Sequence, residues 1–456
     1  MSRPARFALR PLAILIALAP FAASAEDAKL NPVVVSAQKD EQPATAAAVD
    51  SAAVAAARAS TSDAASLLRD VPGVSLYGAG GVSSLPAIHG LADDRLRIKV
   101  DGMDLISACP NHMNSPLSYI DPTSVGAVKV YAGIAPVSVG GDSIGGSVVM
   151  DSTAPTFAAP GQGSLFKGEI GAFYRSNGDG KGANLSATYA TEAFSINYAA
   201  SSAKADDYKA GGDFKNFTAT KNGAGTLPLD EVGSTAYDTR NQALGLALKG
   251  DRDLVEIKFG YQDIPYELYP NQRMDMLANT EHSVNLHYLG QRDWGTLEAR
   301  AYHQTIDHYM DFGSDKEYWY SKSPLPAGYP CSLADPTKCA NGMPMDTHST
   351  TGGASVNASI DLAQQGVLRI GGEYQHYTLN DWWPASGLGM YPNTFQNISD
   401  GKRDRAGLFG EWEATWSPQW HSLAGIRVEH VTTDTGTVQG YSTANYKTSS
   451  VGTLAA

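Results

Sequence analysis

Cysteine is scarce in this chain of 456 residues, which contains only three. Cys331 and Cys339 lie close together in a stretch rich in proline and glycine, where they can bridge one another. We expect this disulfide to close a small loop and to stiffen it. The pair could instead bind a metal ion, but neither cysteine has histidine neighbours at the spacing of a zinc site. Cys109 is then left unpaired, which in an oxidising compartment is a reason to suspect chemistry.

Long apolar runs are also missing once the N-terminus is passed. Residues 1–25 combine early arginines with an apolar run from Leu12 to Phe21 and small residues at 23–25. These are the three regions of a secretory signal peptide, so the mature protein is expected to begin near Glu26. No later stretch approaches the roughly 18 continuous apolar residues that a membrane helix needs. If the chain spans a membrane, it does so as a β-barrel.

Charge is sparse as well. Only 18% of the residues are charged, whereas 43% are hydrophobic, and the chain has 46 glycines and 22 tyrosines. This mixture is unusual for a soluble enzyme and suits a barrel, which needs small residues and aromatic girdles. The net charge of −13 argues against nucleic acid or anionic lipid as a partner and is compatible with attracting cations.

Apolar and polar side chains alternate in several segments, which places one set toward lipid and the other toward a lumen. The segments are 166–175, 194–198, 255–262 and 284–288, with less regular ones around 368–374, 408–416 and 423–431. A soluble β-sandwich is the alternative, but sandwich domains rarely run this long without a break. The pattern predicts a mainly β chain that forms a transmembrane antiparallel β-barrel.

The region before the alternating segments differs in kind. A short helical pattern at 62–69 ends at Pro72 and Gly73, since proline and glycine interrupt helices. Short β segments follow at 95–100 and 125–131, and then a glycine-rich run at 140–146. The glycines could suggest a phosphate-binding loop, but no Gly-Lys-Ser/Thr ending follows them. We therefore expect a small α+β domain that does not bind nucleotides.

Four motifs in the first 150 residues resemble those of TonB-dependent outer-membrane receptors, in the order of that family. The plug-like motifs are 67–74 (LLRDVPGV), 88–102 (from Ile-His-Gly to Val-Asp-Gly) and 143–148 (SIGGSV). The segment that resembles the TonB box is Pro32, Val33, Val34, Val35, Ser36 and Ala37. Such a β-prone segment can add as a strand to the edge of a partner's sheet, although an ordinary disordered leader is the alternative.

The resemblance implies a domain organisation and a location. Residues 1–25 would be the signal peptide, 26–43 an N-terminal segment, 44–156 a plug domain in the lumen, and 157–456 part of the barrel. It also implies a multi-pass protein of the Gram-negative outer membrane, in contact with its lipid. Energy would come from TonB of the TonB-ExbB-ExbD complex, and the protein would not be an enzyme.

Within that family, residues 108–122 are similar to the copper-receptor branch, the OprC- and NosA-like proteins. In that branch a Cys-x-x-x-Met pair on the plug and a His-x-Met pair on the barrel wall bind copper. The match implicates Cys109 and Met113 here, with His308 and Met310 as the second pair. Thiolate and thioether sulfurs are soft donors that select Cu(I), and imidazole also suits copper. The resemblance therefore implies copper, favoured as Cu(I), as the bound substrate.

The spacing of the two pairs is consistent with shared faces. Cys109 and Met113 are four residues apart, so a helical turn opened by Pro110 would put both sulfurs on one side. His308 and Met310 are two residues apart and share one face of a strand. The residues in phase with them are Glu298, Arg300, Tyr302 and Gln304. Both wall residues are therefore expected to point into the lumen.

Other interpretations of these residues stay open. His112 lies inside the motif and could be a secondary ligand, while methionines most often fill gaps in cores. The segment 343–348 is expected to be a polar loop, with a transient methionine site as the alternative. The receptor could also take another metal, a siderophore or haem. A thiol enzyme lacks a visible Cys/His/Asn arrangement, and the plug-like region argues against a passive porin or an adhesin.

The length of the chain departs from the family pattern. Barrels of this family have 22 strands, and the roughly 300 residues after the plug would supply only about half of them. The sequence also ends without a terminal aromatic strand. We expect a truncated or partial chain, whose unpaired strand edges would prevent insertion and transport by this chain alone.

Overall fold

The structure is a computed structural model of residues 1–456, and the part described below belongs to the compact unit Glu41–Ala456. The described residues are 46–49, 51–78, 80–141, 143–220, 225–316, 319–321, 339–363, 366–384, 394–417, 419–439, 448–450 and 454–455. The signal peptide, the TonB-box-like segment and Cys331 lie outside these ranges. The expectations that rest on these residues stay predictions.

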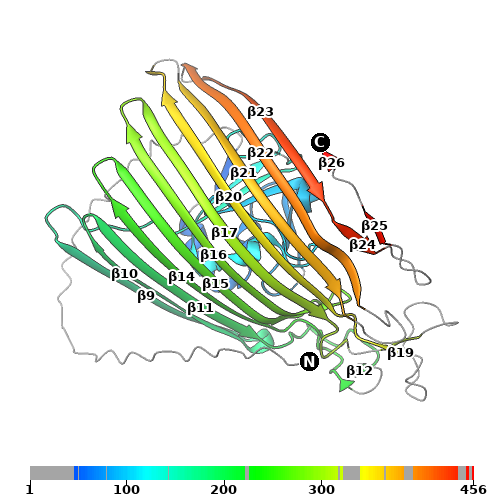
Figure 1. The fold of residues 1–456 in the computed structure, drawn as a ribbon. Helices are drawn as coiled ribbons and strands as arrows, with labels where there is room; N and C mark the ends of the chain where they lie inside the picture. The colour runs from blue at the N-terminus through cyan, green and yellow to red at the C-terminus, as the bar shows by residue number, and fades with distance from the viewer. Residues whose placement is uncertain are drawn as a thin grey trace, which may run out of the picture. The chain divides into compact units, whose positions relative to one another are not determined.

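A large antiparallel sheet, here called the wall, makes up most of the described chain (Figure 1). Each strand pairs with the next long strand along the chain, as expected for consecutive hairpins. Its strands are β9 (Ser164–Arg175), β10 (Gly180–Thr191), β11 (Phe194–Ala205), β14 (Tyr237–Lys249), β15 (Asp253–Glu267), β16 (Asp275–Arg292), β17 (Gly295–Asp311), β20 (Met345–Asp361), β21 (Val367–Trp383), β22 (Phe395–Ser417), β23 (Trp420–Asp434) and β26 (Leu454–Ala455). The predicted mainly β, antiparallel architecture is confirmed.

Three two-stranded hairpins lie in the connections between the wall strands. They are β12 (Ala219–Thr220) with β13 (Gly225–Thr226), β18 (Trp319–Ser321) with β19 (Cys339–Asn341), and β24 (Thr437–Gln439) with β25 (Thr448–Ser450).

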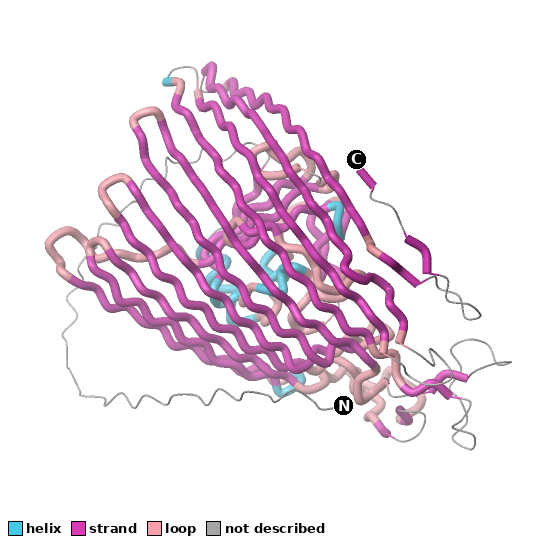
Figure 2. Tube along the Cα trace, viewed as in Figure 1, coloured by secondary structure: helices cyan, strands magenta, loops and turns pink. Residues whose placement is uncertain are grey.

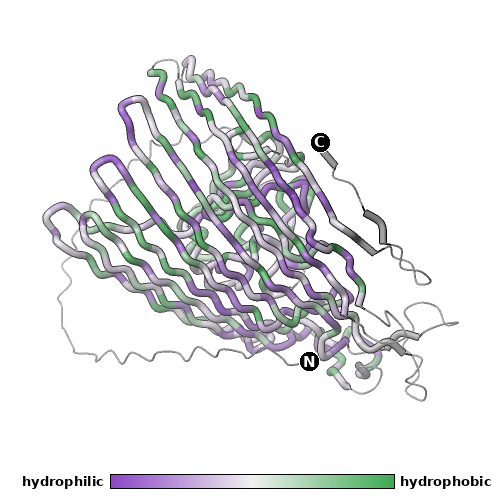
Figure 3. Tube along the Cα trace, viewed as in Figure 1, coloured by the Kyte–Doolittle hydropathy of each residue, from purple (hydrophilic) through white to green (hydrophobic). Residues whose placement is uncertain are grey.

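The two faces of the wall have opposite chemistry. Figure 3 shows hydrophilic and hydrophobic residues alternating along the long strands. Apolar Phe166 and Ile170 are exposed, with 76% and 82% of their surface accessible, whereas polar Gln262 and Asn285 are buried. An exposed apolar face with a buried polar face is the reverse of a soluble sandwich and suits a sheet surrounded by lipid.

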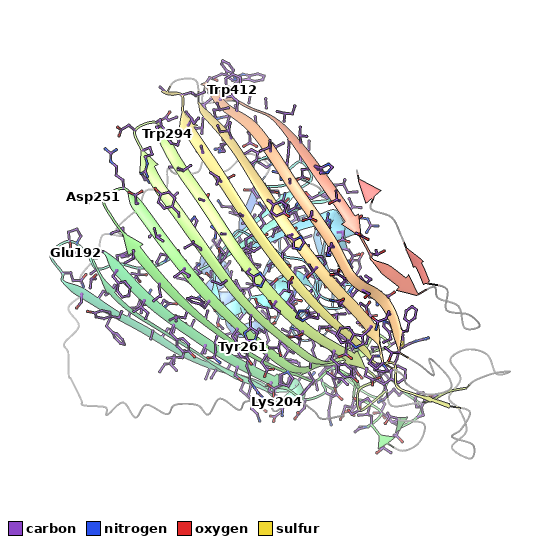
Figure 4. The ribbon with its side chains drawn as sticks, viewed as in Figure 1. Glu192, Lys204, Asp251, Tyr261, Trp294 and Trp412 are labelled. Carbon is purple, nitrogen blue, oxygen red and sulfur yellow. The ribbon has the colours of Figure 1, made fainter. Side chains whose placement is uncertain are left out.

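The connections differ in length between the two ends of the wall. At one end the strands join through short turns, where Figure 4 labels Glu192, Asp251 and Trp294. Connections at the other end include the long segments 206–236 and 312–344. In outer-membrane barrels the short turns are periplasmic and the longer loops are extracellular. The end of β17 that carries His308 and Met310 therefore lies on the extracellular side.

The predicted plug region, called the plug here, forms two small sheets and several helical turns. Its helical turns are the cyan segments behind the wall in Figure 2. One sheet contains β1 (Ala46–Val49), β7 (Val125–Ala132), β8 (Gly146–Ser152), β5 (Leu96–Val100) and β6 (Met103–Asp104), and the other contains β2 (Val74–Tyr77), β3 (Leu85–Ile88) and β4 (Leu91–Ala92). The helical elements are α1 (Ser51–Ala57), η1 (Arg58–Ser60), η2 (Ala64–Leu68), η3 (Asp93–Arg95), η4 (Pro116–Tyr119) and η5 (Pro122–Ser124), while η6 (Asn177–Asp179) lies in the wall.

The plug has an apolar core of its own, in which Leu68, Ile88, Leu117, Val148 and Met150 are fully buried. The short helical pattern predicted at 62–69 is present as the 3-10 helix η2. Within the described part of the chain, no helix is long and apolar enough to cross a membrane.

Buried charges join the plug to the wall. Arg97 of β5 donates to Asp104 at 3.0 Å and also bonds Glu373 of β21. Arg405 of β22 pairs with the same Asp104, and Arg427 of β23 pairs with Glu373. Burial disfavours the charged form of Asp104, but Arg97 and Arg405 outweigh it and hold the pKa of this carboxyl well below its usual range. Asp104 is therefore ionised at neutral pH and is held by guanidinium groups of both domains.

We predict that Asp104→Asn loosens the plug. The amide leaves Arg97 and Arg405 without their shared anion, and breaking a buried ion pair costs about 3–5 kcal/mol. Limited proteolysis of the inserted receptor should then cut the plug faster than in wild type. Asp293→Asn is the matched control, because Asp293 pairs with Arg252 at 2.6 Å in an exposed turn and such surface pairs contribute about 0–1 kcal/mol. Equal cleavage rates in both variants would contradict the role of Asp104.

Candidate metal centre

The plug presents Cys109 and Met113 on a tight turn that follows β6. His112 N donates to Cys109 O at 2.9 Å, and Pro110 takes the second position of this β-turn, which its fixed φ favours. His112 closes the turn with φ of 54°. The prediction of a helical turn is therefore wrong, because the segment forms a β-turn. The β-turn nevertheless leaves both side chains inside, with Cys109 fully buried and Met113 7% exposed.

Hydrogen bonds from neighbouring side chains fix this turn. Ser107 Oγ donates to the carbonyl oxygens of Cys109 at 3.2 Å and Asn114 at 2.5 Å. The amide of Ala108 donates to Tyr119 Oη at 3.4 Å. The backbone around Cys109 is thus held by groups on both sides of the turn.

On the wall, His308 and Met310 face the plug. Both side chains are buried. Arg300, which lies on the same face of β17, donates a hydrogen bond to the carbonyl oxygen of Asp101 in the plug. The predicted lumen face of β17 is therefore the face that contacts the plug. Cys109 Sγ lies 3.9 Å from Met310 Sδ, and Met113 belongs to the same buried cluster. The structure thus places a thiol of one domain against a thioether of the other.

His308 has one satisfied and one unsatisfied ring nitrogen. Nδ1 lies 3.2 Å from Asn279 Oδ1 on β16, whereas Nε2 is buried and makes no hydrogen bond in the structure. Buried polar atoms are nearly always paired, so an unpartnered imidazole nitrogen needs an explanation. A metal ion is one partner that such a nitrogen binds.

Two further methionines flank Met310 in register. The sequence analysis missed Met276, whereas Met345 lies in the segment 343–348, for which a transient methionine site was the alternative. Met276 of β16 pairs with Met310, and Met345, the first residue of β20, pairs with Met310 from the other side. All three side chains are fully buried, and we call them the methionine row. Tyr269 Oη also lies 3.8 Å from Met276 Sδ.

A β-bulge explains why Met276 could not be placed from the sequence. The register of β16 against β17 shifts between Met276 and Ala278, which turns Met276 onto the same face as Asn279. Strict alternation would have put these two residues on opposite faces, and bulges re-aim side chains in this way. The close spacing of the methionines at 274 and 276 was the available signal.

One further expectation is corrected, and one alternative gains no support. The segment 343–348 was expected to be a polar loop, but its residues from Met345 onward belong to strand β20 of the wall. Met345 packs in the same buried cluster as Cys109 and Met113, which we call the sulfur cluster. His348 is instead paired with Asp307 at 2.7 Å and partly exposed. His112 turns toward Asp94, with 3.5 Å between Nε2 and Oδ2, so the structure does not join it to the sulfur atoms.

The donor set is soft. In the described ranges, no group of three or more histidine, cysteine, aspartate or glutamate residues is placed to hold a metal ion. The cluster offers instead the sulfur atoms of Cys109, Met113 and the methionine row. His308 lies two residues from Met310 in β17 and is buried on the same strand face. Sulfur donors of this kind suit Cu(I) and not hard divalent ions. Cys339 opens β19, and its predicted bond to Cys331 remains a prediction.

Comparison with known proteins identifies the N-terminal domain. Residues 38–147 match the model of the TonB-dependent receptor plug domain. The chain therefore contains a TonB-dependent receptor plug domain. A comparison with curated protein sequences finds no match. This match supports the expected location in the outer membrane and the expectation that the chain is not an enzyme.

Solved structures share the fold at low identity. The copper transporter OprC is 19% identical with a TM-score of 0.69, and the match covers 90% of this chain and 59% of OprC. The FrpB iron transporter from Neisseria meningitidis is 18% identical with a TM-score of 0.62, covering 86% and 58%. The ferric enterobactin receptor PfeA is 15% identical with a TM-score of 0.58, covering 86% and 60%. The chain therefore spans about three fifths of the length of these structures.

We predict that Cys109 is unreactive in the folded receptor. Burial raises the pKa of its thiol to about 11, from an ordinary value near 9, so the thiolate fraction at pH 7.5 falls on the order of 100-fold. Alkylation by a neutral maleimide, followed by mass spectrometry, should be slower in the folded protein by at least that factor than in urea. Comparable rates in the two states would show that the thiol is accessible.

Proposed function

We propose that the intact receptor imports copper, as Cu(I), and binds it with Cys109 and Met113 of the plug and His308 and Met310 of the wall. One observation carries this proposal. The Cys109 and Met310 sulfurs lie 3.9 Å apart across the boundary between the domains. Both are fully buried, and the unpartnered Nε2 of His308 belongs to the same strand face.

Charge balance supports a monovalent soft ion. An unpaired charge in a buried site is costly, so an ion is tolerated there when its ligands neutralise it. Cys109 is the one ligand of the four that can supply a negative charge, because it loses its proton when a metal ion binds. One thiolate with neutral thioether and imidazole donors then balances a single positive charge. The apolar surroundings of the sulfur cluster exclude the hydration shell of harder ions.

The position of the site between two domains suggests how binding and movement are coupled. An ion that bridges plug and wall ligands opposes plug movement, and pulling the plug separates the two ligand pairs. The TonB-box-like segment 32–37 precedes β1, whose four residues pair with β7 at the edge of the plug sheet. TonB would act there by strand addition, which lets a partner pull on the plug.

A receptor for iron, a siderophore or haem is the other candidate, because the similar structures include an iron transporter and a ferric enterobactin receptor. Iron in siderophores is held by hard oxygen donors, which do not need a thiol. The buried sulfur pair therefore favours copper over iron and ferric siderophores.

We predict that the four proposed ligands contribute unequally. Cys109→Ser should lose nearly all tightly held copper, because a hydroxyl is a hard and weak donor. Met310→Leu and His308→Ala should weaken Cu(I) affinity less, since each removes a neutral donor. Chelator competition with metal analysis of the purified full-length receptor measures this.

Met150→Leu is the control for these variants, because Met150 is equally buried but lies in the core of the plug. Leucine conserves most of the volume of methionine, so the control should fold and bind copper normally. Unchanged affinity in both His308→Ala and Met310→Leu would confine the site to the plug. Full occupancy in Cys109→Ser would remove Cys109 from it.

We predict that deleting residues 33–37 abolishes copper uptake and leaves copper binding intact, because the segment transmits force and contains no ligand. Val34→Pro should act like the deletion, since proline cannot donate a hydrogen bond to a partner strand. Val34→Thr keeps β propensity and is the matched control. Uptake of radioactive copper by cells, beside binding by purified protein, separates the two effects. Loss of binding in the deletion would contradict the assignment.

A further inference from the structure

Behind His308 lies a buried amide that is not among the proposed ligands. Asn279 of β16 is fully buried and is the register partner of His308 on β17. Its side-chain oxygen lies 3.2 Å from His308 Nδ1. The same oxygen accepts a hydrogen bond from Asn114 Nδ2 in the plug, at 3.3 Å.

This arrangement determines which ring nitrogen of His308 carries the proton. An amide oxygen can only accept, so Nδ1 must be the donor in the contact with Asn279. A neutral imidazole then has its lone pair on Nε2, which is the buried atom without a partner. The donation from Asn114 Nδ2 fixes the orientation of the Asn279 amide, because the amide nitrogen of Asn279, in the place of its oxygen, could not accept this hydrogen bond.

Asn114 is itself held firmly in the turn that carries Cys109. Its side-chain oxygen accepts from Ser118 Oγ at 2.6 Å, and its backbone oxygen accepts from Ser107 Oγ. Asn114 is fully buried and directly follows Met113 in the chain. A continuous set of hydrogen bonds therefore connects the plug turn with the ring of His308.

We propose that Asn279 is a positioning residue that holds His308 in the Nδ1–H tautomer with Nε2 free for the metal ion, and that Asn114 keeps Asn279 in this orientation while the plug is seated. The inference rests on the proposed function and deepens it. Plug movement would then remove Cys109 and Met113 from the ion and would also release the orientation of His308. The wall ligand is thereby coupled to the position of the plug.

Substitution of Asn279 tests the first part. Asn279→Leu and the smaller Asn279→Ala remove the acceptor, and losing such an outer hydrogen bond to a ligating histidine costs about 10–100-fold in affinity. X-ray absorption of the copper-loaded full-length receptor should show fewer nitrogen neighbours in both variants. Asn279→Asp keeps an acceptor and should restore most of the affinity and the nitrogen signal. Unchanged affinity in both Asn279→Leu and Asn279→Ala would overturn the proposal.

Asn285→Leu is the matched control. Asn285 lies on the same strand, is buried on the same face and donates to the plug carbonyl of Asp101 at 2.8 Å. Its loss removes a hydrogen bond between wall and plug but none to His308. Copper affinity of this variant should stay within about twofold of wild type. A loss equal to that of Asn279→Leu would mean that any hydrogen bond between wall and plug supports copper binding, and it would contradict a specific role of Asn279.

A double-mutant cycle separates positioning from packing. If Asn279 acts through His308, Asn279→Leu should lower copper affinity no further in a His308→Ala background. The same fold loss in both backgrounds would overturn the positioning role. Asn114→Leu should likewise lose affinity less in the Asn279→Leu background, and an undiminished loss would remove Asn114 from the coupling. A wild-type receptor that binds no copper would instead overturn the proposed function.

Discussion

The buried ion pairs between plug and wall fix how the two parts of the site meet. Asp104 bonds Arg97 within the plug and Arg405 on the wall, and Arg97 also reaches Glu373. Asp104 is the last residue of β6 and precedes the turn that carries Cys109. Because two charges taken out of water are stable only when they are well paired, the plug has little freedom to shift against the wall. The contact between Cys109 and Met310 depends on that fixed seating.

The sulfur cluster and the hydrogen-bonded amides beside it have different roles in the proposed site. The thiol, the thioethers and their apolar neighbours supply soft donors and exclude water. The amides of Asn114 and Asn279 have little affinity for a soft ion, and their hydrogen bonds orient the single nitrogen donor. Under the proposed function, a site divided between two domains in this way would bind the ion firmly when both are in place. It would weaken as soon as one of them moves.

Much of the fold could be predicted from the sequence because it depends on local periodicity. Alternation along each strand specifies which side chains face lipid, and Phe166, Ile170 and Gln262 lie on the expected sides. The two-residue spacing of His308 and Met310 required a common face wherever the strand was placed. The short β segments and the glycine run before residue 150 likewise indicated a separate α+β domain, which the structure contains.

The sequence by itself determined the faces, the two-domain order and the candidate donors, since these follow from spacing along one chain. Only the tertiary structure decided which residues of different strands meet. A bulge turns Met276 toward Met310, strand pairing places Asn279 opposite His308, and a β-turn in place of a helical turn directs His112 to Asp94. Register between strands depends on bulges and on connections of variable length, such as 312–344, whose geometry no local pattern encodes. The contact between Cys109 and Met310 also depends on tertiary structure, because it forms only when Asp104 of the plug is paired with Arg405 of the wall.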